Sequence, residues 1–527
     1  MFVGLVALTV AGPGAAIVAG VDQNVLIIIA DDLGVDVLEI YGEGSTFPCT
    51  TEIDMLRQEG ILFRNAWSDP VGSPTRATIQ TGRYGLRTGV TALVTPQEDN
   101  GLPLSETIIP EVLDLQENAH LGYSHAAIGK WHLTTPSQGT PPGGYDGPNL
   151  SGYQYFAGLV FGHMDFSSYC DWKRTEGVKG ELPVSATEFG YATTVNVDDA
   201  ITWITTQKTN GDPWFLYLAF NAPHKPFHAP LNSLLCEDGV AEDCNPEPAL
   251  HCPTASDPSC LDLFQDMVEA MDTEIGNLFL EMRNLGVYDD TNIILLSDNG
   301  TAGSVTQSPF DPNHGKPTLY EGGVNVPLII SGPRVDSVLE NTESGVLVNT
   351  TDLYATALEM MGVTAPSGIV LDSVSLVPVL ENTTFVPRPF AYAEIEHSMP
   401  INSGKTIRNA DGYKLIRFGD GTEEFYNLIL DEFETRNLLP VDPGSDDEVN
   451  YCKLTNHLDH LIASAACEGD VNGDGTVNPF DLGYVVARFG CPVATCDLAC
   501  DAADADGDGD VDAEDTAYVL ARLGTCP

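Results

Sequence analysis

The sequence has 527 residues, in which 76 acidic side chains outnumber 23 basic ones and give a formal net charge of −53. A chain of this length accommodates two or three domains and buries a large core. The charge argues against nucleic acid and anionic lipid as partners, because both would be repelled. Basic side chains are so scarce that any lysine inside a polar motif is a candidate for function.

The first 20 residues are predicted to be a signal peptide, because residues 2–20 are apolar and uncharged and end in small side chains. The basic residues that usually begin such a segment are missing. An N-terminal membrane anchor is the alternative. No later segment approaches the roughly 18 apolar residues that span a bilayer. We therefore expect a secreted, periplasmic or cell-surface bacterial protein.

Three apolar runs are predicted to be strands of one parallel sheet. Each run is continuous, which is typical of strands buried on both faces in α/β folds, and each ends in a polar cluster. Since ligand-handling residues gather beyond the carboxyl ends of such strands, we expect the clusters to form one site. The runs and their clusters are 25–29 with Asp31 and Asp32, 214–220 with Asn221 to His224, and 293–296 with Asp298 and Asn299.

Cysteines mark a surface insertion between the last two of these runs. Cys236, Cys244, Cys252 and Cys260 recur every eight residues in an acidic, proline-rich stretch. In an exported chain with twelve cysteines we expect disulfides there, in one of three connectivities, and rank a zinc site second. A helix is predicted to follow over 263–282, because apolar residues recur there at steps of three or four and would face the core.

The tail contains a duplicated acidic loop. A pattern of oxygen donors that starts at Asp470 recurs 34 residues later from Asp504, with a similar helix after each copy. Donors at loop positions 1, 3, 5 and 12, with glycine at position 6, indicate calcium loops. We predict a small all-α domain over 467–527 that binds two Ca²⁺ ions, with a disordered acidic tail as the alternative. The expected ligands are Asp470, Asn472, Asp474 and Asp481 in the first loop and Asp504, Asp506, Asp508 and Asp515 in the second.

Aspartate at loop position 12 makes this tail resemble the dockerin family. The resemblance implies a cohesin module on a scaffold or cell surface as the partner, and we expect calcium to drive folding of the tail. The positions expected to read the partner carry Pro479-Phe480 in one copy and Ala513-Glu514 in the other. Because the copies differ there, another envelope protein is the alternative partner.

The segment 72–83 resembles the signature of the type I sulfatases, and Pro74 and Arg76 keep its register. In this family the first position is a cysteine or serine that a maturation enzyme oxidises to formylglycine, whose hydrate attacks the sulfate ester. Glycine has no side chain to oxidise, so formylglycine cannot form at Gly72. Ser73 is one helical step away, about 100° around the axis, and is expected to point elsewhere.

The resemblance also implies a fold. Residues 21–385 would form an alkaline-phosphatase-like α/β domain with three α/β/α layers and a mostly parallel central sheet. Residues 386–466 resemble the smaller antiparallel subdomain that follows it in sulfatases. The match there is a predicted hairpin that includes 407–417 and is followed by 424–428.

Residue by residue, the resemblance assigns a role to each polar cluster. One hard divalent cation, Ca²⁺ or Mg²⁺, would be held by oxygen donors. Cationic side chains would bind the sulfate, and histidines would assist the aldehyde hydrate and protonate the leaving group. The implied metal ligands are Asp31, Asp32, Asp298 and Asn299. The other implied site residues are Arg76, which would hold the nucleophile loop, Lys130 and Lys316 on the sulfate, His132 beside the hydrate, and His224 as the acid.

The sequence leaves three functions open. The first is a hydrolase of sulfate esters, either aryl sulfates or sulfated polysaccharides. The second is a catalytically inactive module that binds sulfated glycans, and the third is a phosphodiesterase or phosphonate hydrolase of the same superfamily that uses a serine or bound hydroxide. We expect the loop 134–150 and the cysteine-rich insertion to shape substrate choice, since both follow site motifs.

Overall fold

The computed structural model describes most of the chain between residues 23 and 466, and short parts of the tail. The predicted signal peptide and most of the cysteine-rich insertion lie outside the described residues, so these stay predictions. The same holds for the predicted calcium ligands of the tail, of which only Asp515 is described. No described helix is long and apolar enough to cross a membrane. None of the described cysteines, Cys49, Cys170, Cys260 and Cys452, is a free thiol. The described ranges are 23–95, 100–136, 144–162, 164, 169–235, 259–366, 368–396, 403–466, 485–486 and 513–521.

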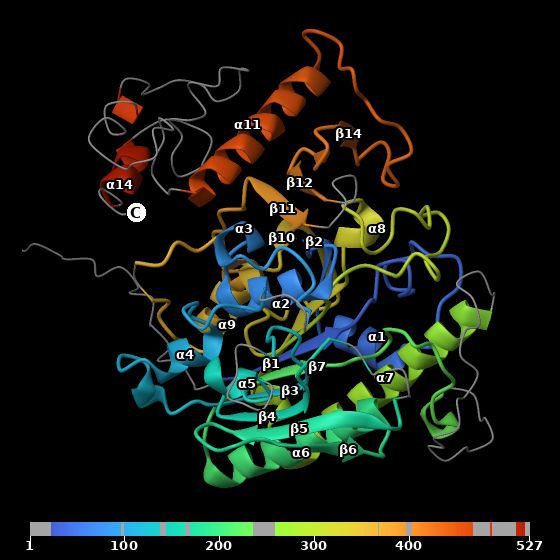
Figure 1. The fold of residues 1–527 in the computed structure, drawn as a ribbon, viewed down its shortest axis with the longest axis vertical. Helices are drawn as coiled ribbons and strands as arrows, with labels where there is room; N and C mark the ends of the chain where they lie inside the picture. Colours follow the sequence, from blue (N-terminus) through green and yellow to red (C-terminus); the bar gives the residue numbers. More distant parts are fainter. Residues whose placement is uncertain are drawn as a thin grey trace, which may run out of the picture.

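A ten-stranded sheet forms the centre of the molecule (Figure 1). The three predicted runs are its neighbouring central strands, and β1 pairs in parallel with both β7 and β8. Strand β3 extends the parallel region from β7 to β4, whereas β9, β5 and β6 run antiparallel to their neighbours. The mostly parallel sheet is therefore confirmed. In spatial order the strands are β10 (Thr342–Asn349), β2 (Gly60–Trp67), β9 (Leu328–Ser331), β8 (Thr291–Ser297), β1 (Asn24–Ala30), β7 (Trp214–Ala219), β3 (Ser124–Lys130), β4 (Tyr155–Leu159), β5 (Trp172–Val178) and β6 (Val184–Glu188).

Helices cover both faces of this sheet, which gives the expected three layers. Side chains alternate along β1, so Leu26 and Ile28 face one core and Val25 and Ile27 face the other. The first core is closed by α1 (Thr51–Gln58), α6 (Ala192–Asn210) and α7 (Ser259–Leu285), and α7 contains the helix predicted over 263–282. The second core is closed by α2 (Gly72–Thr81), α4 (Ile109–Asp114), α9 (Asp352–Met360) and α10 (Val377–Leu380). Shorter elements are α3 (Gly85–Thr88), η1 (Ala119–Leu121), α5 (Gly147–Leu150), η2 (Asn232–Leu234), η3 (Tyr288–Asp290) and α8 (Glu321–Val324).

The second, smaller sheet is antiparallel throughout, as expected. Its order is β11 (Phe390–Ile395), β12 (Gly404–Asn409), β13 (Tyr413–Phe418) and β14 (Glu423–Asn427), so the predicted hairpin is β12 and β13. Helix α11 (Asp446–Ala466) lies along this sheet in the upper part of Figure 1, with Leu454 and Leu458 buried in the shared core. In the tail, α14 (Ala513–Ala521) begins within the last three positions of the second predicted calcium loop, and it contains the predicted ligand Asp515.

A buried charge cluster joins the smaller sheet to helix α8. Lys414 on β13 is fully buried, and its Nζ lies 3.0 Å from Glu321 of α8 and 2.8 Å from Glu434. Arg408 of β12 also contacts Glu321, at 3.3 Å. Removing one member of such a group leaves an uncompensated buried charge, so the cluster fixes the smaller sheet against α8.

Candidate active site

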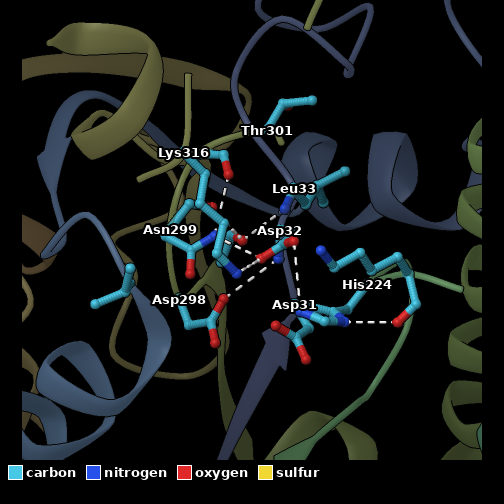
Figure 2. Close-up of polar contacts among 12 residues, drawn as sticks. Asp31, Asp32, Leu33, His224, Asp298, Asn299, Thr301 and Lys316 are labelled. Carbon is cyan, nitrogen blue, oxygen red and sulfur yellow. Dashed lines mark hydrogen bonds and ion pairs between the residues drawn. The ribbon is translucent and has the colours of Figure 1, made fainter. Parts of the chain in front are cut away.

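The polar clusters that follow the central strands meet at one edge of the sheet, as the sequence predicts. Asp31 and Asp32 follow β1, Asp298 and Asn299 follow β8, and Lys130 is the last residue of β3. Lys316 and His224 reach the same point from longer loops, and Figure 2 shows them around Asp32. The order of neighbours, β8-β1-β7-β3, therefore builds the site directly.

Two buried oxygens on the predicted metal ligands have no hydrogen-bond partner among the described residues. They are Oδ1 of Asp31 and Oδ1 of Asn299, both on side chains that are essentially inaccessible to solvent. An unpaired buried oxygen is costly, so each such atom calls for an explanation. Ligand atoms of Asp31, Asp32 and His224 also lie within 4.8 Å of one another. The donor set, mostly carboxylate and amide oxygens, fits Ca²⁺ or Mg²⁺.

Asp32 has an unusual backbone conformation, and both Asp31 and Asp32 have shifted pKa values. Asp32 has a φ of 72°, in the left-handed region that few non-glycine residues adopt and that recurs at functional sites. Burial, together with the Asp298 carboxylate, raises the pKa of Asp31 to about 7 although Lys130 opposes them. Burial alone would also raise the pKa of Asp32, but Lys316 and His224 outweigh it and hold that pKa well below its usual range.

Each of three carboxylates is paired with a cationic side chain. Lys130 Nζ lies 2.5 Å from Asp31 Oδ2, and Lys316 Nζ contacts Asp32 Oδ1. Arg76 donates to Asp298 Oδ2 from Nε at 3.1 Å and from Nη2 at 2.7 Å, and also to the Lys130 carbonyl. The buried guanidinium thus connects α2 to the ends of β8 and β3, which extends the role that the resemblance implies for Arg76.

Residue 72 faces this cluster, although it carries no side chain. Gly72 is the first residue of α2, and a Cβ built on it would lie 2.3 Å from Asp298 Oδ2 and 3.5 Å from Arg76 Nε. Asp298 therefore occupies the space that a side chain at position 72 would enter. Ser73 points elsewhere, as expected, because its Oγ donates to the His132 carbonyl at 3.1 Å and accepts from Val94 N at 3.0 Å.

His132, the first of the two predicted histidines, is buried. His132 has a φ of 58°, and its Nε2 lies 3.1 Å from the Val94 carbonyl, while its buried Nδ1 contacts no polar partner in the part of the chain that the structure describes. Burial, Lys130 and Arg76 lower the pKa of His132 well below its ordinary value.

His224 is held in one tautomer by its own loop. Its Nδ1 lies 2.7 Å from the Lys225 carbonyl, which can only accept a hydrogen bond, so Nδ1 carries the hydrogen. Burial lowers the pKa of His224 to about 3 despite Asp32, whose Oδ2 lies 3.8 Å from Nε2. In this state Nε2 can accept a hydrogen bond or bind a cation. The acid role that the resemblance implies therefore requires the imidazolium to form in a complex with substrate.

Residues that the sequence did not single out hold these loops in place. Thr301 Oγ1 accepts from Gly34 N at 2.9 Å and donates to Asp36 Oδ1 at 2.6 Å, which ties the loop after β1 to the loop after β8. The Tyr169 hydroxyl lies 2.6 Å from the carbonyls of Asn221 and His224 and so braces the His224 loop. The only signal for Asp36 and Thr301 is their closeness in sequence to the metal motifs, and Tyr169 gives none.

Two family models match this chain. The family model described as Sulfatase matches residues 23–363, and the model described as Dockerin type I domain matches residues 468–524. The N-acetylgalactosamine-6-sulfatase of Rattus norvegicus is 29% identical over 471 residues, which cover 84% of this chain and 80% of that protein. The Homo sapiens protein of the same name is 30% identical over 407 residues, covering 72% and 70%.

Solved structures show the same fold. The crystal structure of Ps i-CgsB in complex with k-i-k-neocarrahexaose has a TM-score of 0.66 at 22% identity, covering 84% of this chain and 93% of that chain. BT4656 in complex with D-glucosamine-2-N,6-O-disulfate has a TM-score of 0.63 at 21% identity, covering 84% and 98%. Since the matching family model alone spans well over half of the sequence, this chain belongs to the sulfatase family.

Proposed function

We propose that the chain binds sulfated saccharides at this site, through one divalent cation and two lysines. The cation would be held by Asp31, Asp32, Asp298 and Asn299, and the two orphaned oxygens of Asp31 and Asn299 carry this proposal. The relatives named as N-acetylgalactosamine-6-sulfatases, and the structural neighbours solved with a carrahexaose and a disulfated glucosamine, support a sulfated saccharide as the ligand.

The arrangement suits a sulfate ester. A bound divalent cation supplies a positive charge that stabilises negative charge on the nonbridging oxygens. Lys130 and Lys316 provide two further positive charges beside the carboxylates, in a site that excludes most water. A chain with a net charge of −53 repels sulfate over most of its surface, so such local positive charge is what recruits the ligand. His224 lies beside Asp32, where it can meet the bridging oxygen.

The residue at position 72 affects turnover of the ligand but not its recognition. Every other residue that the family motif names is present, but Gly72 offers no nucleophile and Ser73 Oγ is bonded to the His132 backbone. We propose that the chain as written recognises sulfated saccharide without hydrolysing it by the formylglycine route. Hydrolysis is the second candidate function. A side chain at position 72 would point at Asp298, so a nucleophile placed there would lie inside the site.

One comparison tests both functions. The codon for residue 72 is resequenced, and the chain as written and Gly72→Cys are each produced with a formylglycine-generating enzyme. Binding of N-acetylgalactosamine 6-sulfate with Ca²⁺ is measured by calorimetry, and turnover with 4-nitrophenyl sulfate. We expect both proteins to bind, and only Gly72→Cys to turn over. Turnover by the chain as written would contradict the proposal. Lys179 lies far from the site, so Lys179→Ala is the control for Lys316→Ala. Equal losses of binding in these two variants would also contradict the proposal.

For the tail, we propose a calcium-dependent docking role. A dockerin implies a cohesin-like partner, on a scaffold or on another envelope protein, and placement outside the cell. Two Ca²⁺ ions would be held by the repeated loops, in addition to the cation of the active site. Calorimetric titration should then give a stoichiometry that falls by one in Asp504→Ala and by one in Asp470→Ala. An unchanged stoichiometry in both variants would contradict the paired loops.

A further inference from the structure

The edge of the sheet that carries the site continues past Lys130 onto β4 and β5. Lys130 on β3 is level with Leu159 of β4, and Gly158 of β4 is level with Thr175 of β5. Continuing the antiparallel register places Lys173, near the start of β5, level with Val160. The Val160 carbonyl accepts a hydrogen bond from His132 N at 3.0 Å. Since neighbouring strands are about 4.8 Å apart, the backbone of Lys173 lies roughly 10 Å from that of Lys130 along the same edge.

Aromatic side chains lie between this lysine and the site. Lys173 Nζ is 5.6 Å from the centroid of the Tyr145 ring, which in turn contacts the Phe161 ring edge-on at 5.2 Å. Phe161 is next to Gly162, where a built Cβ would lie 3.3 Å from His132 Nε2. Both rings are half-buried, and both pack on the core that also receives α2. They are therefore on the same side of the sheet as the helix that begins at Gly72.

Among the described residues, Lys173 contacts an aromatic ring but no carboxylate. Its side chain is exposed, and no described carboxylate forms an ion pair with it. Lys179, which directly follows the other end of β5, is paired with Asp114 at 2.7 Å. The chain has nine lysines, and one of them, Lys414, is buried in the charge cluster beside α8. A lysine at the site edge that pairs with no described carboxylate is therefore a distinctive feature.

We propose that Tyr145, Phe161 and Lys173 form a second saccharide-binding subsite beside the sulfate pocket. The rings pack against an adjoining sugar, and Lys173 binds an anionic group of that sugar, a sulfate or a carboxylate. The subsite makes the chain selective for oligosaccharides that carry repeated negative charge over a single sulfated sugar. It also gives the loop 134–150 a physical role in substrate choice, because Tyr145 belongs to it. This inference rests on the proposed function of the neighbouring site.

The inference is tested by comparing a short and a long ligand on the full chain. Calorimetry with Ca²⁺ present measures N-acetylgalactosamine 6-sulfate and a chondroitin 6-sulfate hexasaccharide, in which that sugar alternates with a carboxylated one. The variants are Lys173→Glu and Lys179→Glu, which change the net charge equally at opposite ends of β5. Both lysines are exposed, and thermal unfolding checks that the fold is kept.

We expect the hexasaccharide to bind more tightly than the monosaccharide, and Lys173→Glu to weaken only the hexasaccharide, by roughly fivefold or more. Lys179→Glu should change neither ligand by more than about twofold. Hexasaccharide binding no tighter than that of the monosaccharide, or equal losses in the two variants, would overturn the subsite while leaving the proposed function intact. Failure of the unaltered chain to bind either ligand would overturn the proposed function itself.

Discussion

A side chain at position 72 should change how the site binds its cation, even if that side chain has no chemistry of its own. The proposed change is Gly72→Ala. The new Cβ would lie 2.3 Å from Asp298 Oδ2 and 3.2 Å from Asp298 Cγ, so the carboxylate must move away from α2. In the protein as it stands, Asp298 Oδ2 accepts two hydrogen bonds from Arg76, and a cation has to compete with them.

The size of the effect follows from those hydrogen bonds. A hydrogen bond to a charged group contributes about 1.5–3 kcal/mol. If the methyl group removes one of the two from the cation-free state, the cation no longer has to break it, and its affinity should rise about tenfold or more. The contact is with the far end of a flexible side chain, so the fold should be kept.

Calorimetric titration with Ca²⁺ measures this change on the full chain. Asp31→Asn identifies which transition belongs to the active site and which belongs to the tail. Gly345→Ala is the matched control, because a Cβ there meets nothing closer than 4.0 Å. An unchanged or weaker active-site affinity in Gly72→Ala would show that Asp298 and Arg76 do not compete with the cation.

Three further outcomes follow from buried groups. Lys414→Ala should cost about 3–5 kcal/mol of unfolding free energy in urea titration, because Glu321 and Glu434 lose their counter-charge. Lys453→Ala, at a half-exposed ion pair, should cost less than about 1 kcal/mol, and similar losses in the two variants would contradict the buried cluster. Burial raises the pKa of Glu394 to about 7 from an ordinary 4.5, so the folded state keeps a proton that the unfolded state releases. The unfolding free energy should therefore fall as pH rises through that window, and Glu394→Gln should flatten the fall. An unchanged slope in the variant would refute this role of Glu394. Tyr169→Phe removes the hydroxyl that braces the His224 loop and should lower the unfolding free energy by about 1 kcal/mol; no loss would show that the hydroxyl does not hold the loop.

The sequence predicted the site because its parts are local to single strands. An uninterrupted apolar run such as 25–29 is typical of a strand buried on both faces. The polar pair Asp31 and Asp32 follows this strand, so the parallel sheet sets its position. The same reasoning placed Asp298 and Asn299. Strands β5 and β6 carry no comparable apolar run, so their antiparallel addition to the sheet edge came from the structure alone.

What the sequence could not supply are contacts between residues far apart in the chain. Lys414 and Glu321 are 93 positions apart, and their pairing depends on how the second sheet sits on α8. Asp298 lies against Gly72 only because α2 begins beside the end of β8. Signature motifs give the residue types that a site needs. Contacts between residues far apart in the chain decide whether each of those side chains can reach a ligand.

The central claim is that one divalent cation is held between the ends of β1 and β8. The most direct test is a crystal structure of the chain grown with CaCl₂, in which the calcium is located by its anomalous scattering. The account predicts one ion about 2.3–2.6 Å from Oδ1 of Asp31 and from Oδ1 of Asn299, with Asp298 drawn toward it. A calcium-free cluster in which those two oxygens contact only protein or water would contradict the account.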